Sequence, residues 1–360
     1  MARKHIHIIA TGGTIAGAGE RATQTTGYRA AALGVKEMLA AVSGLDEAAR
    51  VTAEQFCQIA SADMDVPAWL ALARRVNTLL TRGLERTGQA ADTIGTADAA
   101  DSTDAPDAAD SADIVDGVVI THGTDTLEET AYFLNLTVNS EKPLVLVGAM
   151  RPATALSADG PLNLYNAVLV AAHAHSTGMG ALVVMDDAIY AARHVQKTST
   201  FHTHSFKGME YGCLGTVEGG VVEYAYAPLK THTTGSRFSR ALPASLPPVE
   251  IAYAYAGCGS AMLEDAVQRG ACGLVLACTG NGSFTAAMRA FVGAAAERCV
   301  FVRASRIPSG SIAPNGEEND DLFGTVPASD LSPQKARILL MLALGAGLEK
   351  AELRALFREY

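Results

Sequence analysis

The chain has little positive charge and few cysteines, aromatic residues or long apolar runs. Its 360 residues include 28 Lys and Arg against 38 Asp and Glu, so the formal net charge is −10 at pH 7. A protein that binds nucleic acid by neutralising phosphates needs the opposite balance, which argues against that class. The apolar runs, such as residues 144–147 and 181–185, have the length of strands and cannot span a bilayer. The first residues reach Thr11 after too few apolar side chains for a secretory signal, so we expect a cytoplasmic protein with no membrane partner.

The cysteines show no spacing that is typical of a metal site. The sequence has no CxxC pair, and a zinc site needs closely spaced Cys or His ligands. His202 and His204 form an isolated HxH pair, which is a weak metal signal, and we predict no metal. We expect reduced, buried thiols at all six positions, which are Cys57, Cys213, Cys258, Cys272, Cys278 and Cys299.

Nucleotide-binding motifs are also missing. The turn after the first predicted strand contains Gly12, Gly13, Gly17 and Gly19, a spacing that does not fit GxGxxG, and the chain has no GxxxxGK[ST]. We therefore predict no nucleotide cofactor. The glycines instead allow the backbone to approach a ligand, and residues 17–27 have the composition of a lid that carries the following Tyr28 over a site.

Short apolar, β-branched runs alternate with longer Ala- and Leu-rich stretches along most of the chain. With 49% hydrophobic residues, the chain can bury a large core. This alternation is typical of a parallel sheet covered by helices, so the expected fold class is α/β. We predict strands over residues 5–10, 117–121, 143–147, 181–185, 273–277 and 299–303, and helices over 66–86, 127–136, 160–173 and, as a final pair, within 332–360.

Prolines divide the chain into two predicted domains. Pro228, Pro243, Pro247 and Pro248 interrupt regular structure within residues 226–248, which is typical of an interdomain linker. We predict a larger N-terminal parallel-sheet α/β domain over residues 1–225 and a smaller C-terminal α/β domain over residues 249–360.

Residues 87–113 differ in composition from the rest of the chain. They contain nine Ala, seven Asp and no Lys or Arg. Such a segment cannot offset its own ordering entropy, so we predict an acidic, low-complexity insertion that forms a mobile loop. It is either an acidic docking segment or a surface insertion without a role, and the low cost of lengthening a loop favours the second.

Hydroxyl-bearing turns follow the predicted strands at residues 10–14, 121–125 and 278–283. Ligands of open α/β sheets bind outside the carboxyl ends of the strands, so a site is expected there. A threonine becomes a nucleophile only when a neighbour takes its proton, and Tyr28, Asp125 and Lys197 are the available groups. The alternative is structural, since Thr124 and Thr126 are also placed to cap the helix that follows, with Glu128 and Glu129 in its first turn.

Two motifs together resemble the signatures of the bacterial-type L-asparaginase/glutaminase family. They are ATGGTIAG at residues 10–17 and THGTDTLEETA at residues 121–131, in that order. The similarity covers essentially the whole chain apart from residues 87–113. Further matching blocks are GAMRP at 148–152, DGPLNL at 159–164, SRIPSG at 305–310 and PQKAR at 333–337.

The resemblance implies an amidohydrolase that converts L-asparagine to L-aspartate and ammonia without a metal or organic cofactor. By position, Thr14 is the implied nucleophile, and Tyr28 assists it. Thr124, Asp125 and Lys197 form the implied second cluster, and backbone N–H groups beside Thr124 would stabilise the oxyanion. The resemblance leaves open whether the reaction passes through an acyl-enzyme on Thr14 or through direct attack of water.

The resemblance also implies how the substrate is held. Ser61 matches the ligand of the α-carboxylate, and Asp125 pairs with the ammonium group. Ala62 stands where the family usually has Gln or Glu, which removes one ammonium ligand. The family forms homotetramers, as dimers of close dimers, in which Asn281 and an acidic residue of a neighbouring subunit complete the site. Glu317 is the predicted acid and Glu318 the alternative.

Other functions remain as alternatives at this point. A dual glutaminase-asparaginase would carry the same residues. A non-catalytic asparagine sensor is disfavoured by the full Thr/Thr/Lys/Asp set. A subunit of an amidotransferase acting on transfer RNA is disfavoured by the acidic charge.

Overall fold

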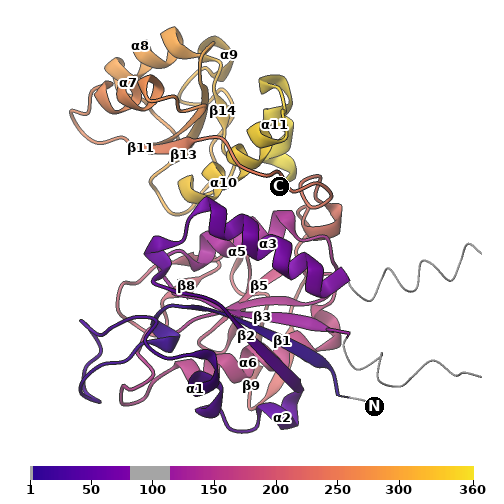
Figure 1. Cartoon of the computed structure of the whole chain (residues 1–360). Coiled ribbons are helices and arrows are strands. Elements are labelled where there is room, and N and C mark those ends of the chain that lie inside the picture. Colours follow the sequence, from indigo (N-terminus) through magenta and orange to yellow (C-terminus); the bar gives the residue numbers. More distant parts are fainter. Residues whose placement is uncertain (1–2, 82–113) are drawn as a thin grey trace, which may run out of the picture.

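The computed structural model describes residues 3–81 and 114–360, which form two large sheets covered by helices and one two-stranded sheet (Figure 1). The predicted acidic insertion at 87–113 and the end of the predicted helix 66–86 lie outside the described residues. The larger sheet belongs to the N-terminal part of the chain and the smaller sheet to the C-terminal part. The predicted α/β fold class is therefore confirmed, while the exact boundaries at 225 and 249 stay predictions.

The larger sheet has eight strands in the order β10-β9-β6-β5-β4-β3-β1-β2. Its centre is parallel, and every residue of β1, β3, β4 and β5 is buried. Continuous apolar runs of this kind form strands that are covered on both faces. The strands are β1 (His5–Gly12), β2 (Arg50–Ile59), β3 (Gly117–Thr121), β4 (Leu144–Val147) and β5 (Ala181–Met185), followed by antiparallel β6 (Ala188–Ala191), β9 (Gly215–Glu218) and β10 (Val221–Tyr224).

The sequence prediction missed β2, which lies at the edge of this sheet and pairs only with β1. Its residues are partly or fully exposed, and polar Thr52, Glu54 and Gln55 interrupt its apolar pattern. An edge strand buries less surface than a central strand, so its sequence carries a weaker signal.

Helices cover both faces of the larger sheet (Figure 1). One face packs against α1 (Val35–Ala40), α2 (Leu45–Ala48) and α6 (Gly160–Ala172). The other packs against α3 (Val66–Thr81) and α5 (Leu127–Thr137), and α10 (Pro333–Gly345) of the C-terminal part lies on α5. One buried apolar cluster runs from α3 and α5 into α10, so the two parts of the chain share a core.

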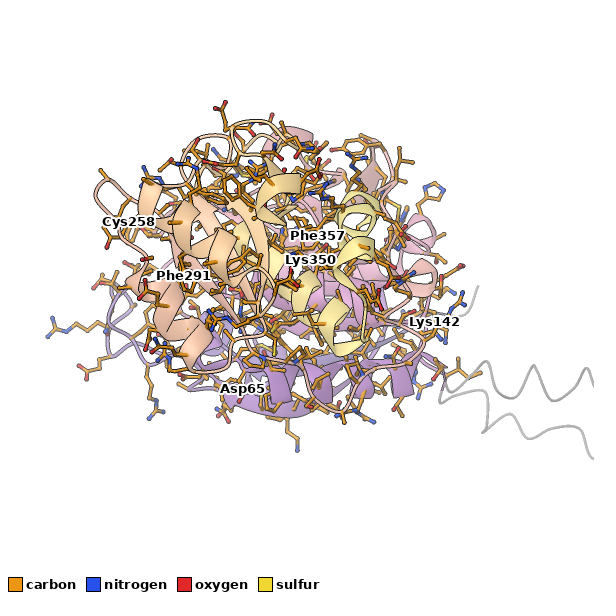
Figure 2. All side chains as sticks on the ribbon, turned by 90° about the horizontal axis from the view of Figure 1, so that it is seen from above. Asp65, Lys142, Cys258, Phe291, Lys350 and Phe357 are labelled. Atoms are coloured by element: carbon orange, nitrogen blue, oxygen red, sulfur yellow. The ribbon has the colours of Figure 1, made fainter. Side chains whose placement is uncertain are left out.

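The smaller sheet is parallel, with the order β11-β12-β13-β14. Figure 2 looks down on this part of the molecule, with Phe291 and Phe357 labelled on two of its helices. The strands are β11 (Val249–Tyr253), β12 (Gly273–Cys278), β13 (Val300–Ser305) and β14 (Val326–Pro327), and the helices are α7 (Ala261–Gln268), α8 (Ala286–Ala295), α9 (Asp320–Phe323), α10 and α11 (Lys350–Glu359).

The segment predicted as a linker, residues 226–248, contains a 3-10 turn, η6 (Thr233–Gly235), and buries Phe238 against the ring of Tyr360. One sequence prediction needs correction. The six cysteines are free thiols, as expected, but Cys272 is exposed and Cys57 and Cys213 are only partly buried. No helix in the described ranges has the length and apolar composition to cross a membrane.

Candidate active site

The candidate site forms where the strand order of the larger sheet reverses. Strand β1 has β2 on one side and β3 on the other, so the turns after β1 and β3 leave the same edge of the sheet. The backbones of these two turns touch, since a Cβ atom on Gly13 would lie 2.2 Å from the Cα atom of Gly123. Gly13 also has a φ of +79°, which favours glycine. The expected meeting of the first two hydroxyl-bearing turns is therefore present in the structure.

The segment after β2 reaches the same place. Ser61 begins the 3-10 turn η2 (Ser61–Asp63), is buried, and its Oγ accepts a hydrogen bond from the Asp125 N–H at 3.2 Å. The Thr126 hydroxyl donates to the Ser61 carbonyl at 2.7 Å and makes no side-chain cap on α5. Thr126 therefore stands at the N-cap position of α5, as considered, but its hydroxyl ties two loops together instead of capping the helix.

Thr14 and Tyr28 form the first pair of the site. Thr14 begins the 3-10 turn η1 (Thr14–Ala16), and its Oγ1 lies 2.8 Å from the Tyr28 hydroxyl. The backbone of the lid folds back on itself through a bridge between Ala18 and Arg29, which brings Tyr28 beside Thr14. Burial raises the pKa of Tyr28, so its phenol keeps its proton at neutral pH.

Lys197, Thr124 and Asp125 form the second cluster. Lys197 lies on β7 (Gln196–Lys197), which pairs with β8 (Phe206–Lys207) in a two-stranded hairpin. Its Nζ donates to Thr124 Oγ1 at 2.8 Å and to Asp125 Oδ1 at 2.6 Å. Thr124 is buried and Asp125 is exposed, so the ammonium group connects a buried hydroxyl to a carboxylate at the surface.

The lid is fastened to a second loop. The Gly19 N–H donates to the Thr154 hydroxyl at 2.8 Å, and the Leu156 N–H donates to the Ala22 carbonyl at 2.7 Å. A cavity of about 620 Å³ lies beside this contact, and its lining includes lid residues and His202 but neither threonine pair. The lid is therefore held against the loop at residues 154–156.

The structure does not join the two C-terminal site residues to these clusters. Asn281 lies in the turn after β12, where its side chain accepts from the Ala313 N–H at 3.0 Å and donates to the Ser311 carbonyl at 3.3 Å. Glu317 is exposed on the loop before α9. Within the described residues, neither makes a hydrogen bond or ion pair with Thr14, Tyr28 or the lysine cluster.

The two candidate acids differ in their surroundings. Glu318 is buried, pairs with the Arg289 guanidinium at 2.6 Å and accepts the Phe284 N–H at 2.9 Å. Burial acts to raise the pKa of Glu318, but these partners lower it overall. Glu318 is therefore engaged within its own protomer, whereas the neighbouring Glu317 is exposed to solvent.

Sequence reasoning missed one contact of the lysine cluster. It placed Glu128 in the first turn of α5 as a charge near the helix terminus, but the structure buries this side chain. Its Oε2 accepts the backbone N–H of Lys197 at 2.5 Å. No pattern in the sequence links these two positions, which are 69 residues apart.

Comparisons with known proteins cover both parts of the chain. The family model of the asparaginase N-terminal domain matches residues 5–85 and 101–230, and that of the glutaminase/asparaginase C-terminal domain matches residues 248–357. L-asparaginase 2 of Bacillus subtilis (strain 168) is 42% identical over 99% of this chain and 86% of its own length. The glutaminase-asparaginase of Pseudomonas fluorescens biotype A is 42% identical over 99% of this chain and 90% of its own length.

A solved structure also shares the fold. The probable cytoplasmic L-asparaginase from Campylobacter jejuni superposes with a TM-score of 0.87 at 37% sequence identity, covering 99% of this chain and 100% of that one. The similarity therefore extends over both sheets and the whole of the candidate site.

Proposed function

Because this chain belongs to the asparaginase/glutaminase family of amidohydrolases, we propose that it hydrolyses L-asparagine to L-aspartate and ammonia with Thr14 as the nucleophile. The observation that carries this proposal is the close approach of the two turns that bear Thr14 and Thr124, at the strand-order reversal. Each of these threonines is bonded to a proton-transfer group. A hydroxyl needs such a neighbour before it can attack an amide carbon.

The reaction begins when Thr14 Oγ1 forms a bond to the side-chain amide carbon of asparagine. Tyr28, 2.8 Å away, accepts the hydroxyl proton as its own phenol proton moves on to the amide nitrogen. The carbon–nitrogen bond then breaks, and the nitrogen departs as ammonia. Water then cleaves the ester on Thr14 and yields aspartate. The Lys197 and Asp125 groups orient Thr124 and the water in this second step.

Ser61 and Asp125 bind the two charged groups of the substrate. The Ser61 hydroxyl accepts a hydrogen bond from the Asp125 N–H, which leaves its proton to donate to the α-carboxylate. Asp125 uses Oδ1 for Lys197, and its second oxygen has no partner among the described residues, so it accepts the substrate ammonium. These bonds at one end of the substrate fix the amide at the other end near Thr14.

Ammonia release from L-asparagine by the purified protein tests the activity. Thr124→Val keeps the side-chain shape and removes the hydroxyl, so we expect kcat to fall by about 10²–10⁴-fold. Thr78→Val is the matched control, because among the described residues this hydroxyl bonds only to the Arg74 carbonyl within α3. Undiminished kcat in both Thr14→Ala and Thr124→Val contradicts the proposal, and asparagine binding without ammonia release by the wild-type protein favours the sensor alternative.

A dual glutaminase-asparaginase is the second candidate, because relatives of similar identity carry that name. Glutamine has one more methylene, which moves its amide relative to Thr14. A difference of one methylene changes selectivity by about 10–200-fold, and we expect asparagine to be preferred. The ratio of kcat/KM for the two amino acids decides between the candidates.

We also propose that the protein acts in the cytoplasm as a homotetramer, a dimer of close dimers, in which Asn281 and Glu317 of one subunit complete the site of another. Both residues are exposed, and their segments are braced together by Arg303, whose guanidinium donates to the Asn281 and Ala313 carbonyls. Mixing the inactive variants Thr14→Ala and Glu317→Ala tests this sharing. If the site is shared, a hybrid contains one site that takes an intact Thr14 from one subunit and an intact Glu317 from the other, so activity returns. If each site is built within one subunit, mixing restores no activity.

A further inference from the structure

The backbone before and at Lys197 is held by two buried charged side chains from different parts of the chain. Glu128 of α5 accepts the Lys197 N–H at 2.5 Å. Lys335 of α10 donates from Nζ to the Arg193 carbonyl at 3.0 Å and to the Val195 carbonyl. Glu128 is 7% exposed and Lys335 is 2% exposed, so both contacts are shielded from water.

A lysine at position 335 is not expected if its only role is to stabilise the fold. It lies in the first turn of α10, where the helix dipole opposes a positive charge, and the Ser332 hydroxyl already caps that turn. Its burial removes an ammonium group from water, and replacing a buried ion pair with apolar residues is often neutral or stabilising. Burial lowers the pKa of Lys335 to about 8, while Glu128 and other nearby charges partly offset this effect.

The same stretch of backbone has a third anchor in the C-terminal part. The guanidinium of Arg193 donates to both carboxylate oxygens of Asp330, at 2.8 and 2.6 Å, and its Nε donates to the Tyr360 carbonyl at 2.6 Å. Residues 193–197 are thus connected to α10, to the loop before it and to the end of α11. The hairpin that carries Lys197 has only two residues in each strand, so these anchors supply most of its fixed geometry.

We propose that Lys335 and Glu128 are positioning residues for Lys197, so that the smaller domain of each protomer fixes the geometry of that protomer's own active site. The inference rests on the amidohydrolase function proposed above. The two side chains do not touch the reacting atoms. They fix the backbone from which Lys197 reaches Thr124 and Asp125, and a displacement of about 1 Å in such a group costs about 10²-fold in rate.

The test compares Lys335→Met, the double variant Lys335→Met/Glu128→Gln, and the control Lys142→Met. Lys335→Met removes the bonds to the Arg193 and Val195 carbonyls, and it removes a nearby positive charge that favours the ionised form of the buried Glu128 carboxylate. In the double variant, a neutral amide replaces the Glu128 carboxylate, and the amide oxygen still accepts the Lys197 N–H. Lys142 is a matched control because its Nζ donates to the Val115 carbonyl at 2.8 Å, at the amino end of the strands, and Figure 2 shows it at the rim of the molecule.

We expect Lys335→Met to lower kcat for asparagine by about 10–100-fold and to change KM by less than about threefold. The melting temperature falls in Lys335→Met and recovers in the double variant, because the unpaired buried charge is gone. The low kcat remains in the double variant. Lys142→Met keeps the wild-type kcat.

Two results overturn the inference. One is a wild-type kcat in folded Lys335→Met. The other is a recovery of kcat together with the melting temperature in the double variant, which would show that Lys335 only compensates a charge. If Lys335→Met does not fold, the neutral double variant provides the kcat measurement. These results differ from a failure of the proposed function, because in that case the wild-type protein itself releases no ammonia.

Discussion

Substitution of Gly13 by alanine tests whether contact between two loop backbones sets the geometry of the site. The new Cβ atom would lie 2.2 Å from Gly123 Cα and 2.3 Å from Gly123 N, where ordinary contact begins at 3.4 Å. The neighbouring atoms are backbone, so no side chain can rotate away. The turn with Thr14 and the turn with Thr124 must therefore move apart by about 1 Å.

The magnitude follows from two separate effects. Gly13 has a φ of +79° and a ψ of −167°, a backbone region essentially limited to glycine, where another residue costs about 1–3 kcal/mol. Overpacking a filled space costs about 1–3 kcal/mol. We expect Gly13→Ala to lower the free energy of unfolding by about 2–6 kcal/mol in total. The separation of the two threonines lowers kcat by about 10²-fold.

Gly178→Ala is the matched control, because Gly178 has a similar φ of +74° and a Cβ atom there would meet nothing within 4 Å. It carries the strain of a positive φ without the clash, so we expect a loss of about 1–2 kcal/mol and an unchanged kcat. Urea unfolding followed by fluorescence measures both variants, since the single tryptophan, Trp69, is buried and stacks on Phe133 at 5.4 Å. Equal stability losses in the two variants, or a wild-type kcat in Gly13→Ala, would refute the reasoning.

Two further predictions concern Tyr28 and Asp330. Tyr28→Phe removes the hydroxyl partner of Thr14, and we expect kcat to fall by about 10–10²-fold while the free energy of unfolding changes by less than about 1 kcal/mol, which steady-state kinetics and urea unfolding check. Asp330→Asn removes the bidentate partner of buried Arg193, and we expect a loss of about 3–5 kcal/mol near pH 7. Burial acts to raise the pKa of Asp330, but Arg193 holds this pKa well below its ordinary value, so the stability difference from wild type is full above about pH 4 and narrows as the pH falls further. Urea unfolding across a pH series measures it, and a difference that stays constant down to about pH 2 contradicts the assignment.

The sequence predicted the centre of the larger sheet well because burial on both faces leaves a strong pattern. Strands β3 and β5 have the predicted bounds, and β1, β4, α5 and α6 differ by at most two residues at an end. The antiparallel extension has strands of only four residues, of which β6 is buried throughout, whereas β9 mixes buried and exposed residues and β10 is partly or fully exposed. Such short strands leave a weak sequence signal. The edge strand β2 was missed because its residues are partly or fully exposed.

The threonine motifs were visible in the sequence because each is contiguous with the strand that presents it. Their neighbours were less visible, since Tyr28 and Lys197 reach the site through loops whose path depends on the whole fold. The contact between Glu128 and Lys197 depends on how α5 packs beside the β7–β8 hairpin, which local patterns do not encode. One signal was present for Lys335, namely a positive charge in the first turn of a helix, where the helix dipole disfavours it.

The proposed sharing of sites through Glu317 and the proposed positioning role of Lys335 assign the smaller domain two different roles. Mixing experiments distinguish these two roles. Glu317 acts on the site of another subunit, whereas Lys335 acts on Lys197 of its own chain. A hybrid of Thr14→Ala with Glu317→Ala therefore contains a complete site. A hybrid of Thr14→Ala with Lys335→Met does not, because one site lacks the nucleophile and the other has a displaced lysine.

We therefore expect mixing to restore activity in the first pair and to leave the second pair at the average of its parents, as measured by ammonia release after dissociation and reassociation. Restoration in the second pair would mean that Lys335 acts across a subunit boundary. The absence of restoration in both pairs, with hybrid formation demonstrated, would mean that Glu317 also serves its own chain. The pairs that regain activity on mixing therefore show whether Glu317 and Lys335 act within their own subunit or on another one. This conclusion does not depend on how strongly each single variant lowers kcat.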